Sequence, residues 1–205
     1  MEKLIGEGAE AKIYLIDFAG KEAVLKDRIK KSYRIPQIDE KLRLQRTRRE
    51  ARILYAAAKA GVDVPNIIFY GGTRLVMHKI DGMLLSRCID SGKRRSAARA
   101  IEGAGKLIGM LHAGGIVHGD YTPANIMVGP DGNAWLIDFG LSEFKTSAEE
   151  RALDLLLMKR SVDAGLFRRF LSGYKKEFGE SGAVCSRLEE IERRGRYQTR
   201  TLLTA

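Results

Sequence analysis

The sequence predicts a two-lobed α+β fold, with a β-rich first lobe and a reduced helical second lobe. Alternating apolar and polar residues mark several segments of residues 1–80, whereas apolar residues at helical spacing dominate residues 81–192. Two polar motifs, His118-Gly119-Asp120 and Asp138-Phe139-Gly140, each follow an apolar run in the second lobe. We expect residues 193–205 to form a basic tail.

Turn residues divide the first lobe into its elements. Ala19-Gly20 is typical of a hairpin turn, and Gly71-Gly72 separates two further strands. Gly61 is suited to end the intervening helix. The expected elements are strands over residues 10–18, 21–26, 66–70 and 74–80, and a helix over residues 39–60. The expected core residues of that helix are Leu42, Leu44, Ile53, Leu54 and Ala57.

The second lobe is predicted from helical periodicity. Asp81-Gly82 is suited to the turn that leads into it. Apolar residues such as Ile101 and Leu107 share one face of its first long helix. The expected helices span residues 97–112, 148–163, 166–178 and 186–194.

The chain is strongly basic, with a formal net charge of +10. Lysine and arginine concentrate between Lys26 and Arg52 and again between Arg193 and Arg200. This balance suits a polyanionic partner, because each phosphate that a protein neutralises releases counterions. Charge alone does not decide between nucleic acid and an acidic protein surface.

Cysteine spacing and hydropathy indicate the compartment. Cys88 and Cys185 lack metal-ligand spacing and lie far apart, which is typical of a reduced intracellular protein without disulfides. No apolar run reaches the roughly eighteen residues of a membrane span, and the N-terminus lacks a signal-peptide pattern. We therefore expect a cytoplasmic protein with no membrane contact.

The two polar motifs carry the residues that phosphoryl transfer requires. Asp120 can orient an incoming hydroxyl or accept its proton, and Asn125 five positions later can reach a magnesium ion. Asp138 on the next strand can hold Mg²⁺ against nucleotide phosphates. We expect His118 to brace the loop rather than act as an acid or base. The ordered pair predicts a kinase-like centre that uses ATP and Mg²⁺; two polar turns beside a hairpin are the alternative.

A glycine-rich turn precedes the first predicted hairpin. Gly6, Gly8 and Ala9 would let backbone N–H groups approach phosphate oxygens. Ala11 stands where the kinase pattern expects a third glycine. Such a turn is weak evidence by itself, and its place ahead of both magnesium motifs supports a nucleotide-binding role.

The first lobe also supplies a candidate cation and a hinge. Lys26 ends a strand where the kinase pattern places the lysine that binds the α- and β-phosphates, and we expect Glu50 to hold it. Glu40 is the rival partner, but capping and the helix dipole explain a carboxylate at a helix start. The hinge between the lobes is expected from Met77 to Ile80, with backbone groups facing the adenine edge.

These residues resemble the protein kinase superfamily and, within it, the small atypical serine/threonine kinase of the KEOPS (EKC) complex. The resemblance covers nearly the whole chain. Its most specific part runs from Lys26 to Pro36 and is similar to that family's K-x-R-x-K-x-Y-R-x-P signature. The other similar segments are residues 6–11, 47–51, 118–120, 150–155 and the basic end at 193–200.

The resemblance implies a bilobal protein-kinase-like fold and an ATP-dependent serine/threonine kinase or ATPase. Such an enzyme would act in a complex that makes threonylcarbamoyladenosine in tRNA. Its partners would be the threonylcarbamoyltransferase subunit and a small regulatory subunit on the first lobe. The basic segments would help to hold acidic surfaces or the tRNA through the complex.

Departures from ordinary protein kinases indicate how the chain is regulated. Gly119 replaces the arginine before the catalytic Asp, so a phosphorylated loop has no arginine there to dock against. Only residues 141–147 separate the metal motif from the next predicted helix, and no Ala-Pro-Glu follows. We expect partner binding, rather than loop phosphorylation, to be the switch. Ser142, Thr146 and Ser147 are the candidate autophosphorylation sites.

Four alternatives stay open at this point. An aminoglycoside- or choline-type phosphotransferase shares the catalytic loop but usually carries a helical insertion for which this chain has no room. A RIO-type ribosome-assembly kinase is closer in size and also lacks the activation segment. A nucleotide-binding scaffold could retain the same residues without turnover. A nucleic-acid-binding protein without enzyme activity would not require the magnesium residues.

Overall fold

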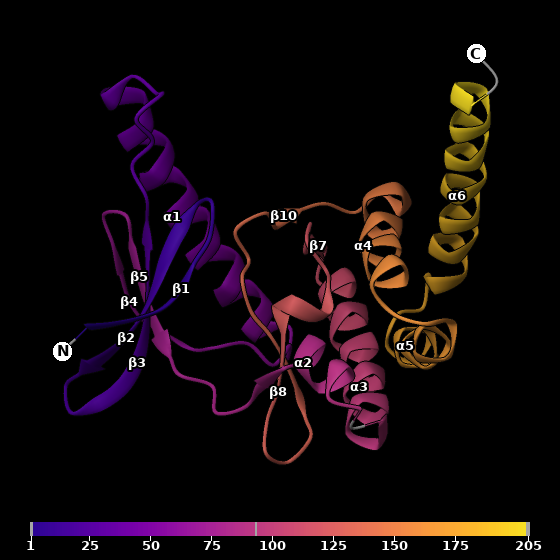
Figure 1. Ribbon diagram of the computed structural model, residues 1–205, viewed down its shortest axis with the longest axis horizontal. Coiled ribbons are helices and arrows are strands. Elements are labelled where there is room, and N and C mark those ends of the chain that lie inside the picture. Colours follow the sequence, from indigo (N-terminus) through magenta and orange to yellow (C-terminus); the bar gives the residue numbers. More distant parts are fainter. Residues whose placement is uncertain (1, 93, 204–205) are drawn as a thin grey trace.

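A computed structural model describes residues 2–92 and 94–203, with side chains described for all of these except 94, 95 and 195–203. The chain forms the two predicted lobes: an N-lobe of antiparallel sheet with one long helix, and a mainly helical C-lobe (Figure 1). The segment after β5 joins them. The bilobal α+β prediction is therefore confirmed.

The N-lobe sheet contains five antiparallel strands in the order β1-β2-β3-β5-β4. They are β1 (Glu2–Glu7), β2 (Ala11–Phe18), β3 (Lys21–Arg28), β4 (Ile67–Gly71) and β5 (Arg74–His78). Strands β2 and β3 form the predicted hairpin, in which Ala19 and Gly20 both adopt positive φ and Asp17 accepts a hydrogen bond from Gly20 N–H. Because β3 lies in the middle of this sheet, its backbone is paired on both edges, with β2 and with β5.

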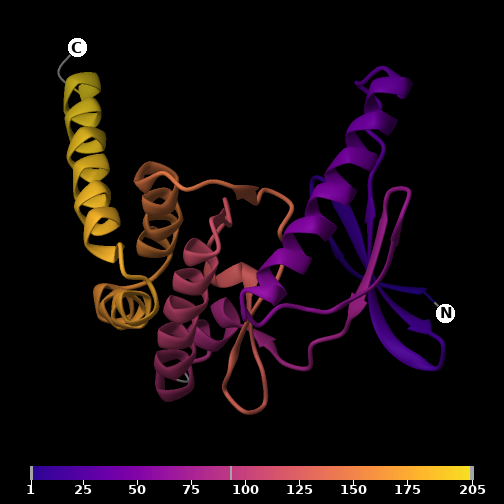
Figure 2. The same cartoon turned by 180° about the vertical axis from the view of Figure 1, so that it is seen from behind.

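The long helix of the N-lobe, α1 (Pro36–Lys59), begins three residues before the predicted start. Pro36 occupies the first turn, where its fixed φ favours the helix and its missing N–H costs nothing. The N-terminal half of α1 projects beyond the sheet (Figures 1 and 2). Leu42 and Leu44 are therefore only partly buried, although the sequence predicted them in the core. The predicted core residues Ile53, Leu54 and Ala57 are buried.

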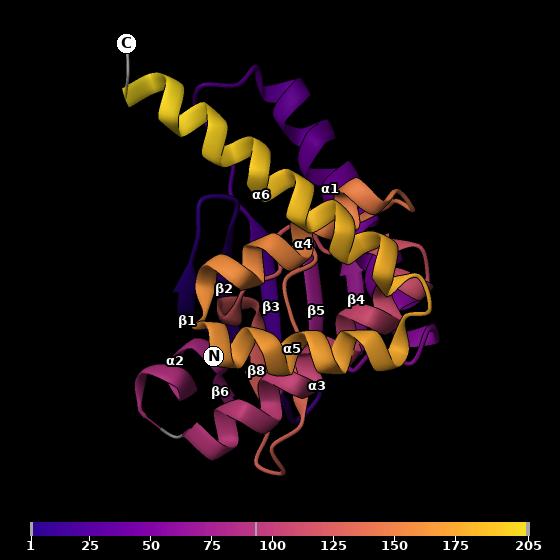
Figure 3. The ribbon, with the colours of Figure 1, turned by 90° about the vertical axis from the view of Figure 1, so that its right-hand side faces the viewer.

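The C-lobe is built from one short helix and four longer helices that pack in two pairs. They are α2 (Leu85–Asp90), α3 (Arg94–Ala113), α4 (Ala148–Ser161), α5 (Ala164–Glu177) and α6 (Ser181–Leu203). Helix α3 packs on α5 so closely that a Cβ on Gly105 would lie 2.0 Å from the carbonyl oxygen of Phe170. Helix α6 crosses over α4 (Figure 3). Aromatic side chains fill the space between these helices, including the fully buried Phe170 and Tyr174.

Short strands and one 3₁₀ turn hold the polar motifs at the edge of the C-lobe. They are β6 (Met83–Leu84), β7 (Ile116–Val117), η1 (Pro123–Asn125), β8 (Ile126–Val128), β9 (Ala134–Leu136) and β10 (Glu143–Phe144). Strands β8 and β9 pair antiparallel, with Ile126 opposite Leu136. Strand β7, just before the first motif, pairs with β10, just after the second. This pairing brings the two motifs side by side.

The basic end of the chain differs from the prediction. The sequence predicted a tail after a helix over residues 186–194, but α6 continues through Leu203. The side chains of Arg196 and Arg200 lie outside the described residues, whereas Arg194 forms an ion pair with Glu190. Among the described helices, none combines the length and the apolar content that crossing a membrane requires.

Candidate active site

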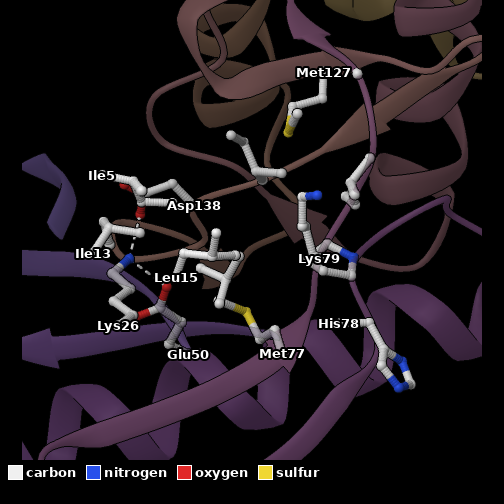
Figure 4. Close-up of a pocket in the computed structure, with 15 residues that line it drawn as sticks. Ile5, Ile13, Leu15, Lys26, Glu50, Met77, His78, Lys79, Met127 and Asp138 are labelled. Carbon is white, nitrogen blue, oxygen red and sulfur yellow. Dashed lines mark hydrogen bonds and ion pairs between the residues drawn. The ribbon is translucent and has the colours of Figure 1, made fainter. Parts of the chain in front are cut away.

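A cavity of about 400 Å³ lies between the two lobes, within the usual size range of small-molecule sites. Its walls are mostly apolar, with the charged groups of Lys26, Glu50 and Asp138 close together and Lys79 apart from them (Figure 4). The remaining lining residues are Ile5, Ile13, Leu15, Val24, Pro65, Met77, His78, Lys79, Ile80, Gly82, Met127 and Ile137. A ligand with an apolar part and a negatively charged part would suit this lining.

Lys26 lies between two carboxylates from different parts of the chain (Figure 4). Its Nζ is 2.6 Å from Glu50 Oε1, on α1, and 2.7 Å from Asp138 Oδ1, which follows β9. The side chains of Lys26 and Glu50 are almost fully buried, whereas that of Asp138 is 52% exposed. Burial by itself lowers the pKa of Lys26, but the two carboxylates outweigh it and raise that pKa. Lys26 is therefore a permanent cation at the cavity.

Asp138 adopts a backbone conformation that few non-glycine residues adopt, with φ of 60°. Its Oδ1 also accepts a hydrogen bond from Gly140 N–H at 3.1 Å. Burial raises the pKa of Asp138, but the charge and hydrogen bond of Lys26 outweigh it and hold that pKa below its ordinary value. The carboxylate is thus ionised and partly exposed, as a metal ligand must be.

The loop after β7 and the η1 turn that follows it carry the other predicted catalytic groups, Asp120 and Asn125. Asn125 Nδ2 donates to the carboxylate of Asp120 at 2.8 Å and to its carbonyl oxygen at 2.9 Å. This leaves the amide oxygen of Asn125 as the atom able to bind a cation. Ile137 N–H donates to the carbonyl oxygen of Asn125 at 3.0 Å, one residue before Asp138. Asp120, Asn125 and Asp138 therefore belong to one compact polar region.

A buried carboxylate on α4 holds this loop. Asp154 accepts hydrogen bonds from the backbone N–H groups of His118, at 2.7 Å, and Gly119, at 2.8 Å. The ring of His112 lies 3.2 Å from the same carboxylate and 3.0 Å from the hydroxyl of Tyr174. Sequence reasoning missed Asp154, because nothing in a helical segment marks which carboxylate points inward.

His118 is fully buried and lies within the loop, where the sequence predicted a brace. Its Nε2 is 3.3 Å from the carbonyl oxygen of Ile137, and its Nδ1 accepts from Asp120 N–H at 3.3 Å. Burial lowers the pKa of His118 and outweighs the neighbouring carboxylates. A neutral, enclosed imidazole fits the bracing role.

Gly119, which replaces the arginine of ordinary kinases, occupies a position that accommodates no side chain. Its φ is +80°, and a Cβ there would lie 2.6 Å from the carbonyl oxygen of Leu141. The loop and the segment after Asp138 are therefore in direct backbone contact. Ser142, one of the candidate phosphorylation sites, is fully buried and donates its hydroxyl to the carbonyl oxygen of His118.

The glycine-rich turn contributes no residue to the cavity lining. Gly6, Gly8 and Ala9 are not among the lining residues. Gly8 N–H donates to the carbonyl oxygen of Ala11, and the carbonyl oxygen of Ala9 accepts from Lys31 Nζ. The adjacent Glu10 pairs with Arg46 of α1. These contacts tie the turn to α1 and to the segment before it.

The structure thus separates the predicted site residues into three groups. Five of them line the cavity: Lys26, Glu50, Met77, Ile80 and Asp138. Asp120 and Asn125 lie on the neighbouring loop, and the three residues of the glycine-rich turn lie apart. The side chain of His78 points away from the other labelled residues (Figure 4). The apolar walls, Arg28 and Asp154 escaped prediction.

The residues present fit a magnesium–nucleotide complex. Among the described residues, no group of three His, Cys, Asp or Glu side chains could hold a metal by itself. Mg²⁺ bound together with phosphates needs only one or two protein ligands and keeps several waters. Asp138 and Asn125 supply that number, and Lys26 supplies the charge that phosphates require.

Two solved structures share this fold. The Rio2 kinase from Chaetomium thermophilum, solved as an ADP/Mg²⁺-phosphoaspartate complex, superposes with a TM-score of 0.55 at 17% identity. That match covers 94% of this chain and 70% of the other. WbdD, solved with the kinase inhibitor LY294002, gives 0.60 at 19% identity and covers 83% of this chain and 44% of the other. At these identities the likeness shows a shared fold.

Sequence comparisons give the family. The RIO domain model matches residues 10–175. The KEOPS complex subunit Bud32 of Pyrococcus abyssi is 40% identical, over 98% of this chain and 99% of that protein. A probable bifunctional tRNA threonylcarbamoyladenosine biosynthesis protein of Methanothermobacter thermautotrophicus is 39% identical over 95% of this chain, which spans only 36% of that longer relative. The chain therefore belongs to the RIO domain family and, within it, to the family of the KEOPS subunit Bud32.

These matches confirm the predicted resemblance to the KEOPS-type kinase and change how the RIO-type alternative relates to it. The motifs of the sequence resemble the KEOPS-type kinase, with a RIO-type kinase as a separate alternative. The match to the RIO domain shows that the two groups share one domain family, so they are not exclusive at that level. The full-length match is to the KEOPS subunit.

Proposed function

We propose that the chain is an ATP-dependent kinase or ATPase of a KEOPS-type complex, with serine or threonine as the acceptor in its kinase mode. Its work would support threonylcarbamoyladenosine formation in tRNA. The observation that carries this proposal is Lys26, held between Glu50 and Asp138 at the cavity and next to the loop of Asp120 and Asn125. The names of the full-length and bifunctional relatives support the pathway.

In this mechanism each residue has a distinct task. Lys26 binds the phosphates, and Glu50 keeps it at the cavity. Asp138 and Asn125 hold Mg²⁺, which when bound neutralises phosphate charge. Asp120 orients a serine hydroxyl or a water molecule and accepts its proton.

The nucleotide's other contacts would come from the N-lobe and the hinge. The backbone between Met77 and Ile80 would face the adenine edge, against the apolar walls of the cavity. Gly6, Gly8 and Ala9 would cover the phosphates after the turn moves toward the cavity. That movement requires breaking the contact between Lys31 and Ala9.

Partner binding is the proposed means of control. The segment after Asp138 is short, and α1 holds it: Arg49 forms an ion pair with Glu143, and Arg52 lies over the ring of Phe144. A partner that moves α1 would therefore move this segment. We propose the threonylcarbamoyltransferase subunit and a small regulatory subunit as these partners, with tRNA bound through the complex. The net charge of +10 supports contact with a polyanion.

The test measures γ-phosphate release from Mg·ATP by the purified chain, alone and with the transferase subunit and tRNA. Asp120→Ala should abolish turnover and keep nucleotide binding. The control is Asp131, an exposed carboxylate in the β8–β9 turn, and Asp131→Ala should change neither turnover nor nucleotide binding. Turnover that ignores the partners would favour a different kinase role. Unchanged turnover in Asp120→Ala would refute the assignment of that residue, and no turnover under any condition would favour a nucleotide-binding scaffold.

A further inference from the structure

A buried arginine next to the site has no task in the mechanism above. Arg28 lies two residues after Lys26 on β3, and alternate residues of a strand share one face of the sheet. Its side chain is 4% exposed, and it is not among the residues that line the cavity. Its Nη2 lies 2.5 Å from Glu50 Oε2. A charge buried this deeply requires a compensating contact, and Glu50 provides it.

Glu50 is thereby held at both of its oxygens. Oε1 accepts from Lys26 and Oε2 accepts from Arg28, and the Glu50 side chain is 3% exposed. If Arg28 were absent, one oxygen of a buried carboxylate would lose its partner, which is costly. The pair of Arg46 with Glu10 is a more exposed contact of α1, with side chains 34% and 45% exposed.

Nucleotide binding would rearrange the cations around this carboxylate. Asp138 is needed by Mg²⁺ and Lys26 by the phosphates, so their 2.7 Å contact has to be exchanged for contacts to the ligand. Glu50 has to stay in place during the exchange, because it is then the only protein carboxylate paired with Lys26. A guanidinium that does not touch the ligand can keep its contact with Glu50 throughout.

We propose that Arg28 is a positioning residue that fixes Glu50 on α1, so that Glu50 keeps Lys26 directed at the phosphates. This inference rests on the proposed nucleotide-binding function. It assigns Arg28 an effect on nucleotide affinity that passes through Glu50 rather than through direct contact. It also gives a physical task to the third residue of the Lys26-Asp27-Arg28 run.

The test is a double-mutant cycle read by calorimetric titration of Mg·ADP into the full chain. Arg28→Met should weaken Mg·ADP affinity about tenfold, and Arg28→Lys should recover part of the loss because it keeps the charge. Glu50→Gln should weaken affinity as well, and the combined variant should be no weaker than Glu50→Gln alone. The matched control is Arg74→Met, which removes an exposed ion pair with Asp27, the neighbour of Arg28, and should leave affinity unchanged.

Several results would overturn the inference. A folded Arg28→Met variant with normal affinity would contradict it, and so would effects of Arg28→Met and Glu50→Gln that simply add. If Arg28→Met does not fold, Arg28→Lys in the same cycle gives the answer, since it retains a cation beside Glu50. A wild-type chain that binds Mg·ADP without turnover would refute the proposed enzyme function yet still permit this test. A wild-type chain that does not bind Mg·ADP would overturn both.

Discussion

The ammonium of Lys26 lies 2.7 Å from the carboxylate of Asp138, although 112 residues separate them in the chain. One residue belongs to the central strand of the N-lobe and the other to the polar edge of the C-lobe. Their contact therefore joins the two lobes at the cavity. A magnesium–nucleotide complex would compete with this contact, because Mg²⁺ would bind Asp138 and the phosphates would bind Lys26.

We expect Asp138→Ala to reverse the effect of magnesium on nucleotide binding. In the wild type, Mg²⁺ should tighten ADP binding, because Asp138 gains a metal partner while Lys26 turns to the phosphates. In the variant, Mg·ADP should bind several-fold more weakly, whereas ADP in EDTA should bind more tightly, since a negative charge is gone. Titration of ADP with Mg²⁺ and with EDTA checks this, and equal affinities in the two buffers for the wild type would contradict it.

Asp154→Ala should be strongly destabilising. The backbone N–H groups of His118 and Gly119 would lose their acceptor within the protein, at a cost of about 3 kcal/mol or more in the free energy of unfolding. The loop that carries Asp120 should lose its geometry, so turnover should fall with stability. Urea unfolding measures the first effect, with Glu102→Ala as the control, because Glu102 pairs with the exposed Lys176. Similar losses in both variants would count against the role of Asp154.

A pair of glycine variants isolates the close approach at the catalytic loop. Gly119 and Gly20 have nearly the same φ, +80° and +79°, so alanine has to adopt the same disfavoured φ at both. Only at Gly119 would the new Cβ meet a neighbour, the carbonyl oxygen of Leu141; at Gly20 it meets nothing within 4 Å. Gly119→Ala should therefore cost about 1–3 kcal/mol more in unfolding free energy than Gly20→Ala. Equal costs would mean that the loop moves aside freely.

Stability should fall as the solution becomes acidic, through two buried histidines. Burial lowers the pKa of both His112 and His118, despite the neighbouring Asp154. Below about pH 6.5 the unfolded chain then binds more protons than the folded chain, so the unfolding free energy decreases as pH falls. The limiting slope is about 1.4 kcal/mol per pH unit for each histidine.

Urea unfolding at about pH 7 and about pH 5.5 checks this expectation. His112→Gln or His118→Gln should reduce the dependence on pH over that interval. The exposed His78 offers the matched control, because His78→Gln should leave it unchanged. A wild-type stability that is flat or rises toward acid would show that other groups dominate.

Much of the fold could be predicted because its signals are local. Alternation located β2 and β3, glycine marked the hairpin and the end of α1, and helical spacing located α3 to α5. Helix α1 starts three residues before the prediction, because Pro36 has a fixed φ that suits the first helical turn. The end of α6 was misplaced as well, because charge density in a sequence does not distinguish an exposed helix from an irregular tail.

The sequence by itself determined the chemistry of the site, because residue type and spacing decide which groups can hold phosphates and magnesium. Only the tertiary structure decided which groups meet. Packing of α1 against the sheet placed both oxygens of Glu50 between Lys26 and Arg28, and packing of α4 placed Asp154 under the catalytic loop. It also joined Ala9 of the glycine-rich turn to Lys31 and the adjacent Glu10 to Arg46 of α1. These contacts join residues far apart in the chain, and their geometry depends on how whole elements pack, which no local pattern records.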